Sequence, residues 1–162
     1  MIFIVVGTQE PFDRLIKYMD EWAGIYKYPN IIAQIAHSSF KPSNFEWFDF
    51  IPVTEFDNKF KQANLIVSHA GMGSILSALQ YSKPIIVMPR LADLKEHRND
   101  HQVATAKSFS KLGYVNAVYS KEELFASLNK RNEIKPVPPI NHQASNLLLS
   151  TLQEFIYKNP NH

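Results

Sequence analysis

The stretch from Ile66 to Leu76 constrains the fold of this chain more than any other part of it. Its sequence is I-V-S-H-A-G-M-G-S-I-L, so a β-branched run passes through a histidine and two glycines into a helical pattern. This order predicts a strand, a tight turn and a helix. The first backbone N–H groups of such a helix have no intrahelical partner, and the helix dipole points the same way. We therefore expect this turn to bind an anion, most often a phosphate.

The size and charge of the chain limit its function classes. Its 162 residues, 45% of them hydrophobic, suffice for one well-cored domain and are too few for two ordinary ones. The net charge of +2 is too small to indicate binding to nucleic acid or to an anionic membrane surface. The absence of cysteine excludes disulfides and thiolate metal sites. The apolar start, residues 1–7, lacks the features of a signal peptide, and no apolar run approaches the ~20 residues of a membrane-spanning helix.

Short apolar runs alternate with helical patterns along most of the chain. We expect strands at 2–6, 31–36, 48–53, 65–68, 84–88 and 114–118. We expect helices at 11–23, 55–63, 74–81, 99–112 and 121–128. This alternation predicts one α/β domain over residues 1–162, a Rossmann-like open parallel sheet with helices on both faces. A proline-rich connector, 131–140, would lead to a C-terminal helix at 141–158.

Three polar loops fall at expected carboxyl ends of strands, where open α/β sheets bind their ligands. The first, Gly7–Glu10, offers amides and a hydroxyl to a phosphate or a sugar, although an ordinary turn would have the same sequence. The second loop is His69–Ser74. His69 is either a core histidine with satisfied ring nitrogens or a donor to a ligand, and its place before the glycine turn favours the donor. Met72 is either an exposed contact or packed, and Ser74 caps the helix or donates to a ligand. The convergence of these loops with a third, residues 89–102, is the main argument for a site.

The third loop carries several polar side chains whose roles the sequence leaves open. Asp100 and Gln102 suit sugar hydroxyls, but an aspartate is also common where a helix begins. His97 and His101 have the i, i+4 spacing of a metal pair, yet no third ligand is evident, so we expect no metal site. Arg90 is either a counter-charge for phosphate or a surface cation.

Four motifs together are specific enough to indicate a family. They are Ser68–Ser74, Lys83-Pro84, Met88-Pro89 and Asp100-His101-Gln102. They resemble the donor-binding domain of GT-B glycosyltransferases, the C-terminal type of glycosyltransferase family 28, which forms the C-terminal half of a GT-B fold. The opening Val5–Ile16 and nearly the whole chain resemble more closely the small subunit of two-part UDP-sugar transferases, in which the GT-B enzyme is divided between two proteins. Such subunits serve dolichol-linked glycans or bacterial capsule and exopolysaccharide, and the bacterial branch is the more similar.

This resemblance implies a function and a set of partners. The chain would be the donor-binding catalytic subunit of an inverting transferase, moving a hexose from a UDP-sugar to a lipid-linked saccharide acceptor. A membrane-anchored partner would bind the acceptor and would hold this chain at the cytoplasmic, inner face of the membrane. No cofactor or metal would be needed beyond the UDP-sugar substrate, and the chain would be active only with its partner. Whether it also forms a homo-oligomer stays open.

The resemblance also assigns residues to the site. Gly71, Gly73 and Ser74 would hold the diphosphate, Gln102 with its neighbours the sugar, and the Phe50-Ile51 segment the uracil. The residues expected to contact the nucleotide-sugar are Gly7, Thr8, Gln9, Ile51, His69, Ala70, Gly71, Met72, Gly73, Ser74, Pro89, Arg90, Asp100, His101 and Gln102. The general base is unknown, with Glu10 and His69 as candidates. Ser77 and Thr105 depart from the family, which often has a glutamate gripping the ribose and an asparagine at these positions.

Two other function classes compete with this interpretation. A non-catalytic nucleotide-sugar-binding subunit that stimulates a partner transferase would have the same pocket. A nicotinamide-dependent enzyme would need the G-x-G-x-x-G fingerprint and a ribose-binding acidic residue after the first strand, and we expect the chain to lack both.

Overall fold

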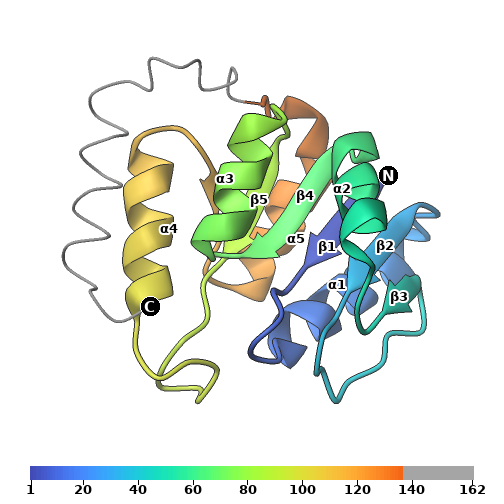
Figure 1. Ribbon diagram of the computed structural model, residues 1–162, viewed down its shortest axis with the longest axis horizontal. Helices are drawn as coiled ribbons and strands as arrows, with labels where there is room; N and C mark the ends of the chain where they lie inside the picture. Colours follow the sequence, from blue (N-terminus) through green and yellow to red (C-terminus); the bar gives the residue numbers. More distant parts are fainter. Residues whose placement is uncertain (137–162) are drawn as a thin grey trace.

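Six parallel strands form one sheet at the centre of the computed structural model, which describes residues 1–136 (Figure 1). The strands are β1 (Ile2–Val5), β2 (Ile31–Gln34), β3 (Glu46–Phe48), β4 (Leu65–His69), β5 (Ile85–Met88) and β6 (Asn116–Ala117). Their order in the sheet is β3-β2-β1-β4-β5-β6. From β1 the chain therefore adds β2 and β3 towards one edge of the sheet, and then adds β4, β5 and β6 on the other side of β1. Ligands of open α/β sheets bind at such a point, beyond the carboxyl ends of the two strands.

Helices cover both faces of the sheet, as the sequence predicts. They are α1 (Asp13–Tyr26), α2 (Val53–Gln62), α3 (Met72–Gln80), α4 (His101–Lys111) and α5 (Lys121–Asn129). Alternate residues of β1 supply two separate cores: Ile2 and Ile4 pack with α1 and α5, and Phe3 and Val5 pack with α2, α3 and α4. Figure 1 shows α2 and α3 in front of the sheet and α1 and α5 behind it. The central strands are apolar because both of their faces are covered.

Helix α1 differs from its expected range of 11–23. It begins at Asp13 with Phe12 as N-cap, so Pro11 precedes the helix and does not occupy its first turn. It continues to Tyr26 and ends where Lys27 takes a left-handed conformation, φ 50°. The apolar stripe predicted the helix but not the residues at which it begins and ends.

The third strand was predicted at 48–53 and lies instead at Glu46–Phe48. Its residues are extended because they pair with Ile32–Gln34 of β2. After Phe48 the chain turns towards α2, and the amide of Ile51 donates to Oε1 of Gln34, 2.9 Å away. The apolar pattern therefore marked the turn after the strand more than the strand itself. The last strand is also shorter than the expected 114–118, with only Asn116–Ala117 paired to β5.

Like α1, three further helices begin at different residues from those expected. Helix α3 starts at Met72 and not at residue 74, which places Gly73 in its first turn. Helix α2 starts at Val53, and α4 starts at His101 with Asp100 as N-cap. Residues 131–133, expected in the connector, form a short 3-10 helix. The C-terminal helix expected at 141–158 lies outside the described residues. Within residues 1–136, no helix is both long and apolar enough to cross a membrane.

Candidate functional site

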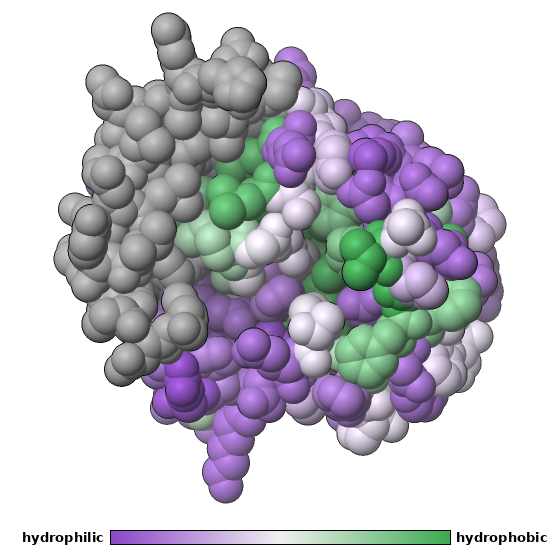
Figure 2. Space-filling view, viewed as in Figure 1, coloured by the Kyte–Doolittle hydropathy of each residue, from purple (hydrophilic) through white to green (hydrophobic). Residues whose placement is uncertain are grey.

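A pocket of about 830 Å³ opens at the carboxyl edge of the sheet, beside β1 and β4. Its size falls within the range usual for small-molecule and cofactor sites. Its walls come from the loop after β1, the turn between β4 and α3, the start of α2 and the start of α4. One wall reaches the molecular surface as apolar area, which Figure 2 shows over the beginning of α2, where Val53 is 85% exposed. The fold thus gathers the three predicted loops around one cavity.

The first turn of α3 forms the polar floor of this pocket. Gly71 is the N-cap, no side chain caps the helix, and no acidic residue lies in its first turn. The sequence left open whether Ser74 caps the helix, and the structure shows no such bond. A Cβ atom added at Gly73 would meet nothing within 4 Å. The helix therefore presents unpaired amides and the positive end of its dipole to open space, which suits an anion.

The ring of His69 lies between two glycine turns. A Cβ atom on Gly71 would come within 2.1 Å of Nε2 of His69, and one on Gly7 within 3.0 Å of Nε2 and of Cε1. Gly7 also has a φ of +83°, which favours glycine. Both glycines therefore make room for the imidazole, and the ring joins the loop after β1 to the turn after β4. From the sequence, the two glycines have a role only towards the ligand, and the structure adds their role in making room for the imidazole.

His69 is electrically neutral at ordinary pH. Burial, with the charge of Arg90 as a second cause, lowers the pKa of His69 to about 3. Burial also lowers the pKa of Arg90 to about 10, so its guanidinium stays protonated. A group with a pKa near 3 is a weak proton acceptor at neutral pH, because general bases work best near the operating pH. This argues against His69 as the general base.

Arg90 holds the loop after β1 in place. Its side chain is 3% exposed and donates to the backbone carbonyls of Val6 (2.6 Å), Glu10 and Pro11. The sequence offered two roles for Arg90, a counter-charge or a surface cation, and burial excludes the second. Arg90 lines the pocket, yet its guanidinium donates to backbone carbonyls, so its role is to shape the loop.

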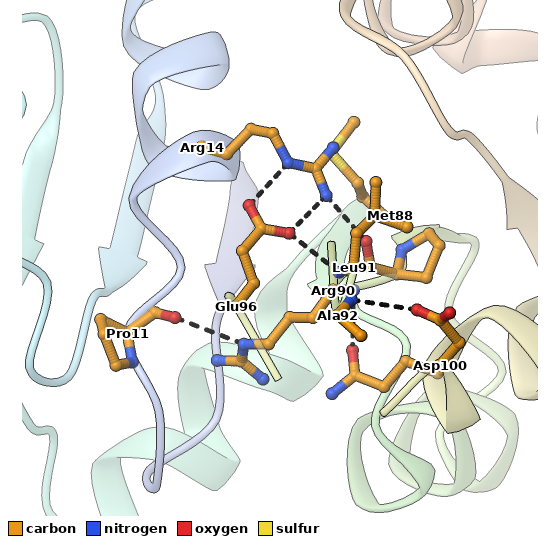
Figure 3. A network of polar contacts seen from close by, with 10 residues as sticks. Pro11, Arg14, Met88, Arg90, Leu91, Ala92, Glu96 and Asp100 are labelled. Carbon is orange, nitrogen blue, oxygen red and sulfur yellow. Dashed lines mark hydrogen bonds and ion pairs between the residues drawn. The ribbon is translucent and has the colours of Figure 1, made fainter. Parts of the chain in front are cut away.

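An ion pair anchors the loop between β5 and α4 to α1. Nε and Nη2 of Arg14 donate to the two carboxylate oxygens of Glu96 at 2.7 and 2.8 Å, and Nη2 also donates to the carbonyl of Pro89 at 2.9 Å. The same carboxylate accepts from the amide of Leu91, 3.0 Å away. Figure 3 shows this network beside the Arg90 contact to Pro11. The loop after β5 is therefore held to α1 through Arg14 and to the loop after β1 through Arg90.

Another part of the pocket lining is apolar and aromatic. It is lined by Phe50, Ile51, Val53, Phe56 and Phe60. Gln34, at the end of β2, positions this wall through its bond to the amide of Ile51. The pocket is therefore divided between the uncapped start of α3 and an apolar part, which suits a ligand with an anionic part and a ring.

Most of the predicted contact residues line this pocket. The structure places there Gly7, Thr8, Gln9, Ile51, His69, Ala70, Gly71, Met72, Gly73, Ser74, Arg90, His101 and Gln102. Glu10, a candidate for the general base, lines the pocket as well. Pro89 and Asp100 do not line it. The carbonyl of Pro89 accepts from Arg14, and Oδ1 of Asp100 accepts from the amide of Ala92 at 3.0 Å, so both residues shape the loop instead.

The side-chain amide of Gln102 has a backbone partner, and the residue also lines the pocket. Its Oε1 accepts from the backbone amide of Arg90 at 3.2 Å. His97 and His101 both line the pocket, with His97 Nδ1 3.2 Å from the carbonyl of Asn99. Among residues 1–136, no three histidine, cysteine, aspartate or glutamate side chains gather as metal ligands do. Glu96, which stands next to His97 in sequence, bonds to Arg14.

Sequence reasoning missed six residues of the pocket lining. They are Val5, Gln34, Val53, Phe56, Phe60 and Arg98. Gln34 could have been found, because it ends a strand whose neighbour in the sheet carries a predicted site loop. Phe56 and Phe60 also carried a signal, since their i, i+4 spacing puts both on one face of α2.

The chain is similar in sequence to known glycosyltransferase proteins. Residues 1–155 match the family described as the glycosyltransferase family 28 C-terminal domain. The chain is 31% identical over 124 residues to the human UDP-N-acetylglucosamine transferase subunit ALG13, a match that covers 70% of this chain and 10% of the human protein. It is 41% identical over 80 residues to the subunit of the same name from Eremothecium gossypii, covering 48% of this chain and 37% of that protein. The chain thus spans less than half of the length of these relatives.

Solved structures agree on the fold. An NMR structure of ALG13 superposes with a TM-score of 0.61 at 21% identity, covering 93% of both chains. The crystal structure of Acinetobacter baumannii MurG superposes with a TM-score of 0.59 at 18% identity, covering 94% of this chain and 49% of that one. At such identities the likeness establishes the sheet and its helices alone.

Proposed function

Because the chain belongs to the family of glycosyltransferase family 28 C-terminal domains, we propose that it binds a UDP-sugar and forms the donor half of a two-part inverting transferase. The transferred group is a hexose and the acceptor is a saccharide carried on a lipid. The relatives named above as UDP-N-acetylglucosamine transferase subunits support a UDP-sugar donor. The greater similarity of the chain to the bacterial branch of these subunits supports a place in capsule or exopolysaccharide synthesis.

The divided pocket is the observation that carries this proposal. A UDP-sugar has a flat base, a doubly charged centre and a polar sugar, in that order. The aromatic wall at Phe50 and Ile51 suits the base, and the uncapped start of α3 suits the diphosphate. Gln102 and His101, at the start of α4, then lie in the same cavity to meet the sugar.

The chemistry follows from where charge develops. In an inverting transfer an acceptor hydroxyl attacks the anomeric carbon and the diphosphate departs, gaining negative charge in the transition state. Amides of Met72, Gly73 and Ser74 are fixed by the helix before reaction, so they stabilise that charge without reorganising. Removing one such donor typically costs about 3 kcal/mol of barrier stabilisation. We propose that this electrostatic stabilisation makes a metal ion unnecessary, and transfer should then persist in EDTA.

The reaction also needs a general base to take the proton of the acceptor hydroxyl. The low pKa of His69 makes it a poor candidate, while Glu10 is exposed at the rim of the pocket. We propose that a membrane-anchored partner supplies the acceptor site and that either Glu10 or a partner group removes the proton. This arrangement would place the chain at the cytoplasmic face of the membrane. The weakness of His69 as a base also favours the second candidate function, a non-catalytic UDP-sugar-binding subunit that stimulates a partner transferase.

Calorimetry with the purified chain tests the donor site. We expect UDP and UDP-sugars, UDP-N-acetylglucosamine included, to bind, uridine to bind far more weakly, and NAD not to bind. Failure of UDP to bind would refute the proposal.

A radiolabelled transfer assay tests the division of labour. We expect little transfer by the chain alone and restored transfer after co-expression with a partner protein. Gln102→Ala should then reduce transfer in the complex, whereas a chain that only stimulates its partner would tolerate the change. Full transfer by the purified chain alone would refute the two-part arrangement.

A further inference from the structure

The last two residues of β4 make an unusual contact with each other. Ser68 is fully buried, and its Oγ lies 3.2 Å from Nδ1 of His69. The same Nδ1 lies 3.4 Å from the carbonyl oxygen of Val5 on the neighbouring strand. One ring nitrogen thus faces both a hydroxyl group, which can donate or accept, and a carbonyl, which can only accept.

The two neutral forms of the imidazole satisfy these groups differently. If Nδ1 carries the proton, it donates to Val5 or Ser68, and the buried Ser68 O–H then has no acceptor. If Nδ1 is unprotonated, it accepts from Ser68 O–H. Among the contacts of residues 1–136, His69 is the one hydrogen-bond partner of Ser68 Oγ. Buried hydroxyl groups are almost always bonded, so this accounting favours the second form, in which Nε2 carries the proton.

The position of Nε2 makes the choice between the two tautomers matter for anion binding. Nε2 is the ring nitrogen that lies between Gly7 and Gly71, on the side away from Val5 and beside the N-cap of α3. A proton there adds one side-chain donor to the unpaired amides of the first helical turn. A bare Nε2 would instead present a lone pair to the same space and would repel an anion.

We propose that Ser68 is a positioning residue that fixes the tautomer of His69, so that the Nε2–H group donates into the anion-binding end of the pocket. The proposed function supplies the anion, the diphosphate of a nucleotide-sugar. The tautomer itself is a property of the free chain and does not depend on that function.

The charge state of the ring makes the tautomer decisive. The surroundings of the ring hold its pKa near 3, so His69 is not a cation that would attract phosphate in either orientation. The positive groups facing it are the guanidinium of Arg90 and, when protonated, His97. With charge removed, the location of one proton determines whether His69 attracts or repels the ligand.

Nitrogen NMR of the unliganded chain tests the proposal directly. Long-range proton–nitrogen correlation spectra distinguish a protonated from an unprotonated ring nitrogen, and His69→Gln identifies the His69 signals among those of the six histidines. At pH 7 we expect a protonated Nε2 and an unprotonated Nδ1. The opposite pattern in the wild-type chain would overturn the proposal, whatever the variants do.

The variant Ser68→Ala gives a second, independent result. Without the hydroxyl group, Nδ1 can donate to Val5, so the Nδ1–H form should become populated. UDP affinity should fall about tenfold, the usual effect of losing a hydrogen bond to a charged group, with uridine affinity unchanged. Ser68→Thr keeps the hydroxyl and should keep both the wild-type spectrum and UDP affinity.

Ser38→Ala is the matched control. Ser38 is also buried and bonds to a carboxylate of α1, away from the pocket lining. This change should move neither the His69 signals nor UDP affinity. An unchanged tautomer in Ser68→Ala would overturn the role given to Ser68. If UDP does not bind the wild-type chain at all, the proposed function fails, while the spectra still decide the tautomer.

Discussion

Placing a carboxylate at Gly73 should stabilise the chain and abolish UDP binding together. Gly73 is exposed, lies in the first turn of α3, and has open space where a Cβ would be. Gly73→Asp therefore enters without a clash and puts a negative charge at the positive end of the helix. Replacing glycine within a helix and matching the dipole each contribute a few tenths to about 1 kcal/mol. Together they should raise the unfolding midpoint by roughly 2–4 °C.

The same carboxylate would occupy the place proposed for the diphosphate. Two unit charges about 4 Å apart repel by about 4 kcal/mol at an effective dielectric constant near 20. UDP affinity should therefore fall by more than about a hundredfold. Differential scanning calorimetry measures the first effect and titration calorimetry the second. Gly73→Asn is the control, since it has the same shape without the charge and should lose less affinity.

Retention of UDP affinity in Gly73→Asp, within a few-fold of the wild type, would refute the placement of the phosphates at α3. Equal losses in the aspartate and asparagine variants would show that bulk and not charge excludes the ligand.

Three further predictions concern stability. Gly71→Ala drives a Cβ into the ring of His69 and should destabilise the fold by about 1–3 kcal/mol in urea unfolding; an unchanged midpoint would contradict the close contact. Because His69 has a pKa of about 3 in the fold and about 6.5 when unfolded, the unfolded chain binds more protons between these values. Stability should therefore be lost as pH falls through that window, by up to about 1.4 kcal/mol per pH unit, and His69→Gln should show a shallower pH dependence of the unfolding free energy. Arg14→Met leaves the carboxylate of Glu96, which is 13% exposed, without its ion-pair partner and should lower the free energy of unfolding by about 3 kcal/mol. The double variant with Glu96→Met should recover part of this loss. Additive losses in a double-mutant cycle would refute the coupling.

Local patterns predicted the fold well because its strands and helices carry their signals within a few residues. Ile2–Val5 and Ile85–Met88 are apolar throughout, as buried parallel strands are, and the structure confirms both as strands. The parallel sheet with helices on both faces is likewise confirmed. Pairing decided what the pattern could not: Glu46 is charged and exposed, yet it belongs to β3 because it lies opposite Ile32.

The location of the pocket followed from the fold class, but the roles of its polar side chains depend on distant partners. Arg14 and Glu96 are 82 residues apart in sequence, and nothing near either one signals the pair. The local sequence does not show that Arg90 is buried, because its burial arises from packing against the loop after β1. Its role therefore stayed open between a phosphate ligand and a surface cation. Asp100 suited a sugar by its chemistry, but the structure directs its carboxylate to the amide of Ala92.

The imidazole of His69 and the two glycine turns around it share a single small volume, so these three positions are not free to change in any order. A larger residue at 71 is tolerable only once the ring has gone, and losing the ring removes the reason for glycine there. Related chains that keep His69 should accordingly keep Gly71, whereas Gly7, with its φ of +83°, should persist whether or not the ring is there. The joint presence or absence of His69 and Gly71 in relatives would then trace which lineages retained this way of joining the first and fourth strands.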